Sequence, residues 1–349
     1  MDSAAPRWVL GIESSCDEMA AAVIRDGQEI VASTVRGQAD VHAPYGGVVP
    51  ELASRDHVRG VSQVVAEALA GAGIEARELG GVAVTAGPGL VGSLLVGLSF
   101  GKALAYRLSI PLVGVHHLEA HLAAAELADA ALRPPYVGLV VSGGHTALYR
   151  IEADGPPQLL GQTRDDAVGE AFDKVAALLG LPYPGGPAVS QAAERGNPRA
   201  VAFPRPLLRT DGFDFSYSGL KTAVALEVER RGGLAENDVA DIAASFEAAA
   251  VEVLVVRAGR AMAEQGVDRL AVVGGVAANR RLRSELAEAG AAQGYRAVFP
   301  PPELCTDNAA MVAAAGARLL ARGESHGFAL NAFSRVPLGE APWLGDARE

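Results

Sequence analysis

Two histidines four residues apart, His117 and His121, are the side chains in this sequence that most directly suggest metal chemistry. They stand at the start of an alanine-rich run, residues 118–132, whose composition predicts a helix. Residues four apart share one face of a helix, so both imidazoles can be directed at one point. Neutral imidazole binds zinc, iron, copper or nickel, and a carboxylate from elsewhere commonly completes such a site. The spacing alone also fits an ordinary histidine pair at a helix start.

A zinc protease is the obvious alternative for paired histidines, but its H-E-x-x-H motif is absent here. Leu118 follows His117, and Glu119 projects from a different part of the turn. The general base of that reaction is therefore misplaced, and the sequence disfavours a protease.

Asp307 is the best downstream candidate for a third metal ligand. It precedes a predicted helix, residues 309–320, at an element end from which a carboxylate can face a cleft. The same position suits Asp307 or Thr306 to be the N-cap of that helix. Cys305 is a softer alternative ligand, although packing among apolar residues fits it better.

Two further stretches have the composition of ligand-binding turns. Residues 142–146 (Ser-Gly-Gly-His-Thr) follow an apolar strand, and their glycines allow a phosphate to approach the backbone N–H groups. Residues 274–279 follow the strand 269–273 and lead into a helix, as nucleotide-binding turns of α/β proteins do. Ordinary tight turns have the same composition, so neither stretch is decisive alone. Residues 182–187 are too rich in Pro and Gly for regular structure and are expected to form a loop or hinge.

An internal repeat indicates how these segments are positioned. Tyr136–Arg164 can be laid on Trp8–Arg36 without a gap, and both stretches read strand, polar loop, strand, Asp-Gly turn, strand. Two such halves in a chain of 349 residues predict two α/β domains that face a cleft, with both polar loops pointing into it.

Composition limits the class of protein. Hydrophobic residues make up 50% of the chain, but charged or small residues interrupt every apolar run before it reaches membrane-spanning length. Two cysteines and no export signal favour a reducing cytoplasm. The net charge of −11 argues against a broad basic surface. Two local basic clusters exist, Arg205 with Arg209 and Lys221, and residues 280–283, and each is interpreted as a solvated face.

Taken together, nine blocks of residues in order make the chain resemble the bacterial tRNA threonylcarbamoyladenosine transferases, the TsaD family, formerly labelled O-sialoglycoprotein endopeptidases. The likeness extends over roughly residues 8–340. The blocks that carry it are residues 11–18, 46–57, 85–90, 117–121, 141–146, 169–174, 215–221, 274–279 and 305–308.

The resemblance implies an α/β protein with the actin-like ATPase (sugar kinase/Hsp70/actin) fold, two duplicated α/β domains around a central cleft. On that basis residues 1–132 form the N-terminal domain, completed by 309–349, and residues 133–308 form the C-terminal domain. It also implies one divalent metal ion, usually iron(II) with zinc as the alternative, held by His117, His121 and Asp307. The family's ligand-binding positions fall on Val140, Val141, Ser142, Gly143, Gly144, Asp173, Gly186 and Asn279.

The activity implied is transfer of a threonylcarbamoyl group from L-threonylcarbamoyladenylate to the N6 amine of the adenosine next to the anticodon. The substrate tRNAs read codons that start with A. The implied partners are a TsaB-type paralogous subunit and a TsaE-type P-loop ATPase, with no membrane. Glu18 and His145, on the two polar loops, are candidate general bases.

Two other functions fit the same fold. An ATP-dependent small-molecule kinase would not need the histidine pair, and a non-catalytic chaperone-like ATPase would not need tRNA. Metal analysis beside a His117→Ala variant separates the kinase from the transferase.

Overall fold

The computed structural model describes residues 6–340 and divides into two compact units. The first unit contains Met1–Ala128 together with Thr306–Glu349, and the second contains Asp129–Cys305. The domain boundaries suggested by the sequence, residues 132 and 308, lie a few residues further along the chain. As a result Asp307 belongs to the same unit as His117 and His121.

The first unit is built on a five-stranded sheet with strand order β3-β2-β1-β4-β5. β1 pairs antiparallel with β2, and β2 with β3, whereas β4 is parallel to both β1 and β5. Parallel neighbours require helical crossovers, and α2 and α3 provide them. The strands are β1 (Trp8–Glu13), β2 (Met19–Arg25), β3 (Glu29–Arg36), β4 (Gly81–Gly87) and β5 (Leu112–His116).

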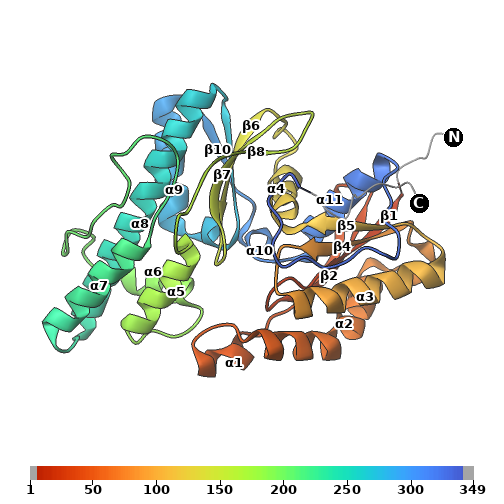
Figure 1. Cartoon of the computed structure of the whole chain (residues 1–349), viewed down its shortest axis with the longest axis horizontal. Helices are drawn as coiled ribbons and strands as arrows, with labels where there is room; N and C mark the ends of the chain where they lie inside the picture. Colours follow the sequence, from red (N-terminus) through yellow and green to blue (C-terminus); the bar gives the residue numbers. More distant parts are fainter. Residues whose placement is uncertain (1–5, 341–349) are drawn as a thin grey trace. The chain divides into compact units, whose positions relative to one another are not determined.

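Helices cover both faces of this sheet (Figure 1). Leu10 and Ile12 of β1 pack in a core with residues of α2 and α3. Gly11, between them, faces the other side, where an added Cβ would lie 2.2 Å from the carbonyl oxygen of Ala309 in α11. Successive residues of a strand point to opposite faces of the sheet. The large side chains of β1 therefore pack on α2 and α3, and the glycine lets the backbone of α11 come close on the other face. The helices are α1 (Ala39–His42), α2 (Pro50–Ala72), α3 (Val91–Leu108), α4 (His117–Ala128) and α11 (Ala309–Ala321), with 3-10 turns at Ala43–Tyr45 and Ala76–Glu78.

The second unit repeats the topology. Its sheet order is β10-β9-β6-β7-β8, again an antiparallel meander of three strands followed by two parallel ones. The strands are β6 (Tyr136–Val141), β7 (Thr146–Ile151), β8 (Gln158–Gln162), β9 (Arg269–Val273) and β10 (Arg296–Val298). The helices are α5 (Val168–Leu178), α6 (Gly185–Ala193), α7 (Ser218–Arg231), α8 (Glu236–Gln265), α9 (Arg280–Gln293) and α10 (Pro302–Cys305), with a 3-10 turn at Gly275–Ala278.

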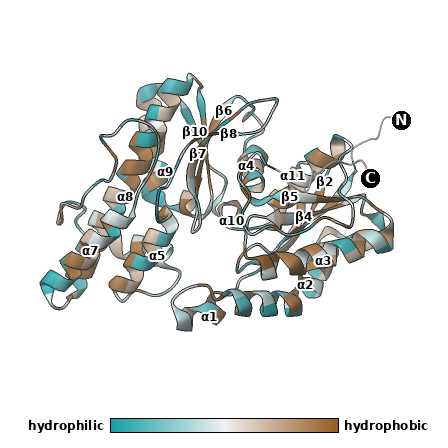
Figure 2. Ribbon diagram, in the orientation of Figure 1, coloured by the Kyte–Doolittle hydropathy of each residue, from teal (hydrophilic) through white to brown (hydrophobic). Residues whose placement is uncertain are grey.

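The matching strand orders confirm the duplicated α/β fold predicted from the sequence. β1 and β6 occupy the positions that the gap-free superposition of Trp8–Arg36 on Tyr136–Arg164 pairs with each other. Along α2 and α3, teal and brown segments both appear, as expected for helices with one buried and one solvated side (Figure 2). Within residues 6–340, no helix combines the length and the apolar character that a bilayer crossing requires.

Local details depart from the sequence predictions at the end of α4 and at the start of α6. α4 ends at Ala128 rather than at residue 132. Directly after Ala128, the Asp129 carboxylate accepts a hydrogen bond from the N–H of Ala131, and this bond stabilises a turn. The segment 182–187 is not wholly irregular, because α6 begins inside it at Gly185. Pro187 is tolerated there because the first turn of a helix needs no intrahelical N–H donor.

Candidate metal centre and ligand loop

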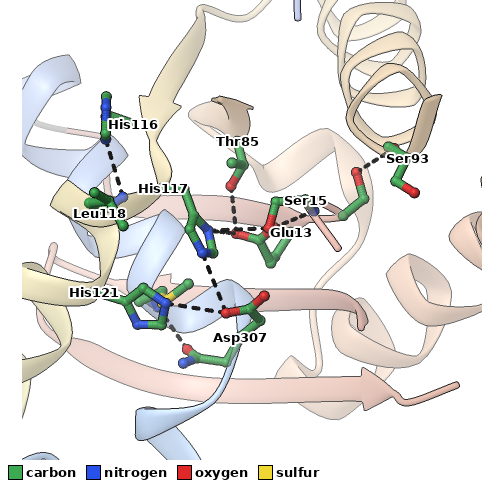
Figure 3. Close-up of polar contacts among 12 residues, drawn as sticks. Glu13, Ser15, Thr85, Ser93, His116, His117, Leu118, His121 and Asp307 are labelled. Atoms are coloured by element: carbon green, nitrogen blue, oxygen red, sulfur yellow. Dashed lines mark hydrogen bonds and ion pairs between the residues drawn. The ribbon is translucent and has the colours of Figure 1, made fainter. Parts of the chain in front are cut away.

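His117, His121 and Asp307 converge in the first unit (Figure 3). His117 is the first residue of α4, directly after β5, and His121 lies one turn further along the same face. The Asp307 Oδ1 atom is 3.2 Å from His121 Nε2 and 3.5 Å from His117 Nε2. One donor atom from each residue lies within 4.8 Å of the others, so the three side chains can hold one metal ion.

The distances from the Asp307 oxygen to the two imidazoles fit a first-row metal. Metal–ligand bonds of about 2.0–2.2 Å at tetrahedral or octahedral angles place neighbouring ligand atoms about 2.8–3.6 Å apart. The donor set is two imidazole nitrogens and one carboxylate oxygen, which zinc and iron both accept. Three protein ligands leave coordination positions for a substrate or water.

Asp307 is available as a ligand because its neighbour caps the helix. The N-cap of α11 is Asn308, whose side-chain oxygen accepts a hydrogen bond from the N–H of Met311 at 3.0 Å. The N-cap role expected for Asp307 or Thr306 is therefore wrong, because the cap lies one or two residues further along, at Asn308. Cys305 is fully buried, and its sulfur lies 3.2 Å from the Arg283 guanidinium, so it packs in the second unit.

A buried carboxylate that the sequence reasoning missed lies behind His117. Glu13, at the end of β1, is 0% exposed, and its Oε2 lies 3.2 Å from His117 Nδ1. The Thr85 hydroxyl donates to the same oxygen at 2.7 Å, and the N–H of Ser15 donates to Oε1 at 2.6 Å. An imidazole that donates Nδ1–H to a carboxylate keeps the lone pair of Nε2 for a metal. Only the position of Glu13 at a strand end hinted at this role.

The electrostatics of the metal-free centre follow from burial among acids. Burial lowers the pKa of His117, but the Asp307 and Glu13 carboxylates outweigh it and raise the pKa to about 9. The pKa of Glu18, half-buried in the β1–β2 loop, is raised to about 9 by burial and then by the charges of Asp307 and Asp17. Carboxylates that lie this close together repel one another, and a bound cation would offset that repulsion.

His116, which precedes the candidate ligands, has a structural role instead. Its Nε2 lies 3.1 Å from the carbonyl oxygen of Val336, and its Nδ1 accepts from the N–H of Leu118 (Figure 3). His116 thus fixes the first turn of α4 and the chain beyond α11, and it turns away from His117 and His121.

In the second unit, the loop between β6 and β7 is an exposed glycine turn. A Cβ added at Gly143 or Gly144 would meet nothing within 4 Å, so the outer side of the turn is open. The inner side is closed, because a Cβ at Gly169 would lie 2.6 Å from the carbonyl oxygen of Ser142. A Cβ added at Gly274, whose φ is +95°, would lie similarly close to the carbonyl oxygen of Val141. The N-terminus of α5 and the β9 turn are therefore packed against residues 141–143.

The remaining predicted ligand positions of the second unit lie on α5, on α6 and at the start of α9. Asp173 Oδ1 accepts a hydrogen bond from the N–H of Gly185 at 2.8 Å, which joins α5 to the start of α6. The neighbouring Gly186 has open space where a Cβ would be.

Asn279 is held by three polar neighbours. Its Oδ1 caps α9 by accepting from the N–H of Leu282 at 2.9 Å. Its Nδ2 lies 2.7 Å from Glu247 Oε1 and 3.0 Å from Ser190 Oγ. The second lone pair of Oδ1 is the polar capacity that remains for a ligand.

The predicted site residues are thus divided between the units. Glu18, His117, His121 and Asp307 belong to the first, and residues 140–145, Asp173, Gly186 and Asn279 belong to the second. The local basic clusters largely pair within the chain: Arg205 with Glu252, Lys221 with Asp166, and Arg280 with Glu194.

Comparison with known proteins decides the family. Residues 29–314 match the family model TsaD, described as tRNA N6-adenosine threonylcarbamoyltransferase. The chain belongs to the TsaD family. A protein of that name from Syntrophotalea carbinolica is 52% identical over 336 residues, which covers 96% of this chain and 98% of the relative. One from Geobacter sp. strain M21 is 53% identical over 330 residues, covering 95% and 96%.

Solved structures agree on the fold alone. Full-length HypF superposes with a TM-score of 0.60 at 13% identity, covering 92% of this chain and 56% of that one. Component A of (R)-2-hydroxyglutaryl-CoA dehydratase from Acidaminococcus fermentans gives a TM-score of 0.51 at 16% identity, covering 90% and 99%. The actin-like ATPase fold predicted from the sequence is confirmed.

Family membership makes the chain a transferase that modifies tRNA and sets the small-molecule kinase aside. The His/His/Asp cluster is a possible metal site of this enzyme.

Proposed function

We propose that the chain transfers the threonylcarbamoyl group of L-threonylcarbamoyladenylate to the N6 amine of the adenosine adjacent to the anticodon. The tRNA substrates read codons that start with A, and AMP is the second product. The convergence of His117, His121 and Asp307 in a chain of the TsaD family is the observation that carries this proposal.

The chemistry demands positioning more than a strong base. The lone pair of an adenine amine is delocalised into the ring, so the acylating partner must be activated, as a mixed carbamic–phosphoric anhydride is. The protein must then align the amine with the carbamoyl carbon and stabilise the charge that develops.

We assign His117, His121 and Asp307 as the ligands of one divalent metal ion, iron(II) in the first instance and zinc as the alternative. Such an ion supplies Lewis-acid polarisation of phosphate or carbamoyl oxygens. Glu13 holds the His117 imidazole in the required tautomer through the contact at Nδ1.

In the second unit, the loop Ser142–Gly144 binds phosphate through the backbone N–H groups of Gly143 and Gly144, with Val140 and Val141 leading into that turn. The open outer side of the turn supports this role. The N–H of Ser142 donates within the turn, to the carbonyl oxygen of His145 at 2.8 Å. Asp173 accepts ribose hydroxyls, because an ionised carboxylate only accepts hydrogen bonds. Gly186 and Asn279 flank the adenosine.

Removal of the amine proton is assigned to His145 or Glu18. A carboxyl group with a pKa of about 9 is protonated at neutral pH and cannot act as a base. Glu18 therefore acts as a base only if its pKa falls, against burial first and the charges of Asp307 and Asp17 second. His145, the other candidate, lies on the loop proposed to bind phosphate.

We place the enzyme in the cytoplasm, without a membrane, acting with a TsaB-type paralogous subunit and a TsaE-type P-loop ATPase. The experiment supplies the chain with both partners, a synthase that makes the adenylate, threonine, bicarbonate, ATP and tRNA. The expected product is threonylcarbamoyladenosine in the tRNA, dependent on the chain. Absence of that nucleoside with a partner set that works with a relative would overturn the proposal.

A further inference from the structure

A chain of buried polar side chains in the first unit has no role in the site described so far. Gln38, His42 and His57 are 2%, 0% and 0% exposed. Gln38 lies between β3 and α1, His42 is the last residue of α1, and His57 lies on α2. Their hydrogen bonds connect the start of α2 to the β1–β2 loop. Three polar side chains this deeply buried are costly unless every donor and acceptor is paired.

The direction of each hydrogen bond follows from its neighbours. The N–H of Val49 can only donate, so His42 Nδ1, 3.2 Å away, carries a lone pair and His42 Nε2 carries the proton. That Nε2–H donates to Gln38 Oε1 at 3.1 Å. The amide nitrogen of Gln38 then donates to the carbonyl oxygen of Ala53 at 3.3 Å and to His57 Nδ1 at 2.8 Å.

His57 completes the sequence of bonds. Because its Nδ1 accepts from Gln38, its Nε2 carries the proton and donates to the carbonyl oxygen of Cys16 at 2.9 Å. Each bond fixes the tautomer or amide orientation of the next, and both imidazoles must be neutral. Burial lowers the pKa of His57, against smaller opposing effects of the Cys16 carbonyl and of the Glu13, Asp56 and Asp17 carboxylates.

We call this series of hydrogen bonds, from Val49 through His42, Gln38 and His57 to Cys16, the relay. Its last bond reaches Cys16, the neighbour of a residue that contacts the candidate metal centre. Cys16 follows Ser15, whose hydroxyl lies 3.2 Å from His117 Nδ1. Ser15 is also held by its N–H on Glu13 and by its carbonyl oxygen, which accepts from the N–H of Leu90 at 2.7 Å. His57 therefore fixes the Cys16–Asp17 peptide, one residue beyond Ser15, and so limits the freedom of the Ser15 hydroxyl against the His117 ring.

We propose that Gln38, His42 and His57 are positioning residues, which hold the Cys16–Asp17 peptide next to Ser15 and thereby orient the His117 imidazole. The inference rests on the proposed metal centre but makes a separate claim about the metal-free protein. A buried network with a purely structural role would affect stability without altering the His117 ring.

Three variants of the full chain separate these roles. His57→Leu breaks the relay, whereas His57→Gln can still accept from Gln38 with its oxygen and donate to the Cys16 carbonyl with its amide nitrogen. Val61→Ala, one turn further along α2 in the same core, lowers stability without touching the relay. Unfolding curves measured for all three provide the common scale.

The first measurement is the nitrogen NMR spectrum of the histidine rings in metal-free protein. We expect the Nε2–H tautomer at His42 and His57, and a shift of the His117 ring signals in His57→Leu only. The opposite tautomers, or His117 signals in His57→Leu that match those of Val61→Ala, would overturn the inference. This readout decides the relay even if the wild-type chain binds no metal, an outcome that would count against the proposed function instead.

The second measurement is the affinity for zinc alone, determined by competition with a chelator. Loss of a side chain that is hydrogen-bonded to a metal ligand typically weakens metal binding by about tenfold or more. Because His57 acts through Cys16 and Ser15, we expect a loss of less than about tenfold in His57→Leu, recovery of affinity in His57→Gln, and wild-type affinity in Val61→Ala. Equal affinities in His57→Leu and Val61→Ala would contradict a positioning role.

Discussion

The loops that follow β1 and β6 begin from equivalent strands and differ in what they offer a ligand. The β1 loop carries Glu13 and Ser15, both buried and both in contact with His117. At the equivalent place in the repeat, the β6 loop carries Val141 and Gly143, and the latter is exposed with open space around it. One loop therefore presents buried side-chain acceptors, and the other presents an open glycine backbone.

This difference shows how a duplicated fold acquires two binding chemistries. The shared strand order determines where each loop begins, but the side chains determine the charge it binds. Buried acceptors beside imidazoles suit a cation, and an exposed glycine turn suits an anion. The predictions below test whether metal and phosphate binding are separable in this way.

The largest effect is expected from removal of a metal ligand in the first unit. His121→Ala or Asp307→Ala should abolish stoichiometric metal binding and reduce transfer by at least about a hundredfold, because two remaining ligands hold a metal poorly. Metal content by elemental analysis checks this. The control His326→Asn keeps an acceptor for the N–H of Gly114 at another buried histidine and should retain the metal. Full metal content in Asp307→Ala would refute the site.

A smaller loss is expected when the acid behind His117 is neutralised. Glu13→Gln preserves shape but removes the charge, so zinc affinity should fall by about tenfold and the pKa of His117 should fall with it. Chelator competition and histidine NMR measure the two effects. Glu67→Gln, at an exposed position on α2, is the control and should change neither. Unaltered zinc affinity in Glu13→Gln would mean that Glu13 does not support the ligand.

In the second unit, two glycines provide a matched pair. Gly144→Ala meets no protein atom, so its stability should stay within about 0.5 kcal/mol of wild type while AMP binding weakens by about tenfold. Gly169→Ala meets the carbonyl oxygen of Ser142 at 2.6 Å and should lose about 1–3 kcal/mol of stability. Calorimetry with AMP and chemical unfolding measure these. If Gly144→Ala binds AMP normally, the glycine turn is not the phosphate site.

The smallest effect on chemistry is expected at Asp166, which supports the second unit only. Its carboxylate lies 3.0 Å from Lys174 Nζ and 2.7 Å from Lys221 Nζ. Burial raises the pKa of Asp166, but the two lysines outweigh it and lower the pKa below the ordinary 3.8.

A group with a lowered pKa contributes stability above its unfolded-state pKa and loses it as the pH falls through the folded-state value. Asp166→Asn should therefore cost about 1–3 kcal/mol at neutral pH and flatten the loss of stability below pH 3.8. Metal content should not change. Unfolding curves from pH 2 to 7 test this, and a variant as acid-sensitive as the wild type would contradict the assignment.

The sequence predicted those features that depend on local pattern. The Asp26-Gly27 turn between apolar runs indicated the β2–β3 hairpin, and the spacing of His117 and His121 indicated a shared helix face. The repeat predicted the second sheet because its turns recur at matched places. Its position at an element end made Asp307 a candidate third ligand, and the family resemblance assigned it to the histidines.

Features that depend on distant segments were missed. Glu13 and His117 are separated by 104 positions in the chain, and no local signal pairs them. The N-cap of α11 was placed one or two residues early, because Thr306, Asp307 and Asn308 all have capping side chains and only backbone geometry selects Asn308. The helical start at Gly185 was obscured by prolines that a first turn can accommodate.

Anomalous X-ray diffraction from crystals of the iron- or zinc-loaded protein would locate the metal ion itself. We expect a strong peak at the metal's absorption edge within bonding distance of His117 Nε2, His121 Nε2 and Asp307 Oδ1. A peak at other residues, with these three side chains still bonded to one another, would contradict this expectation.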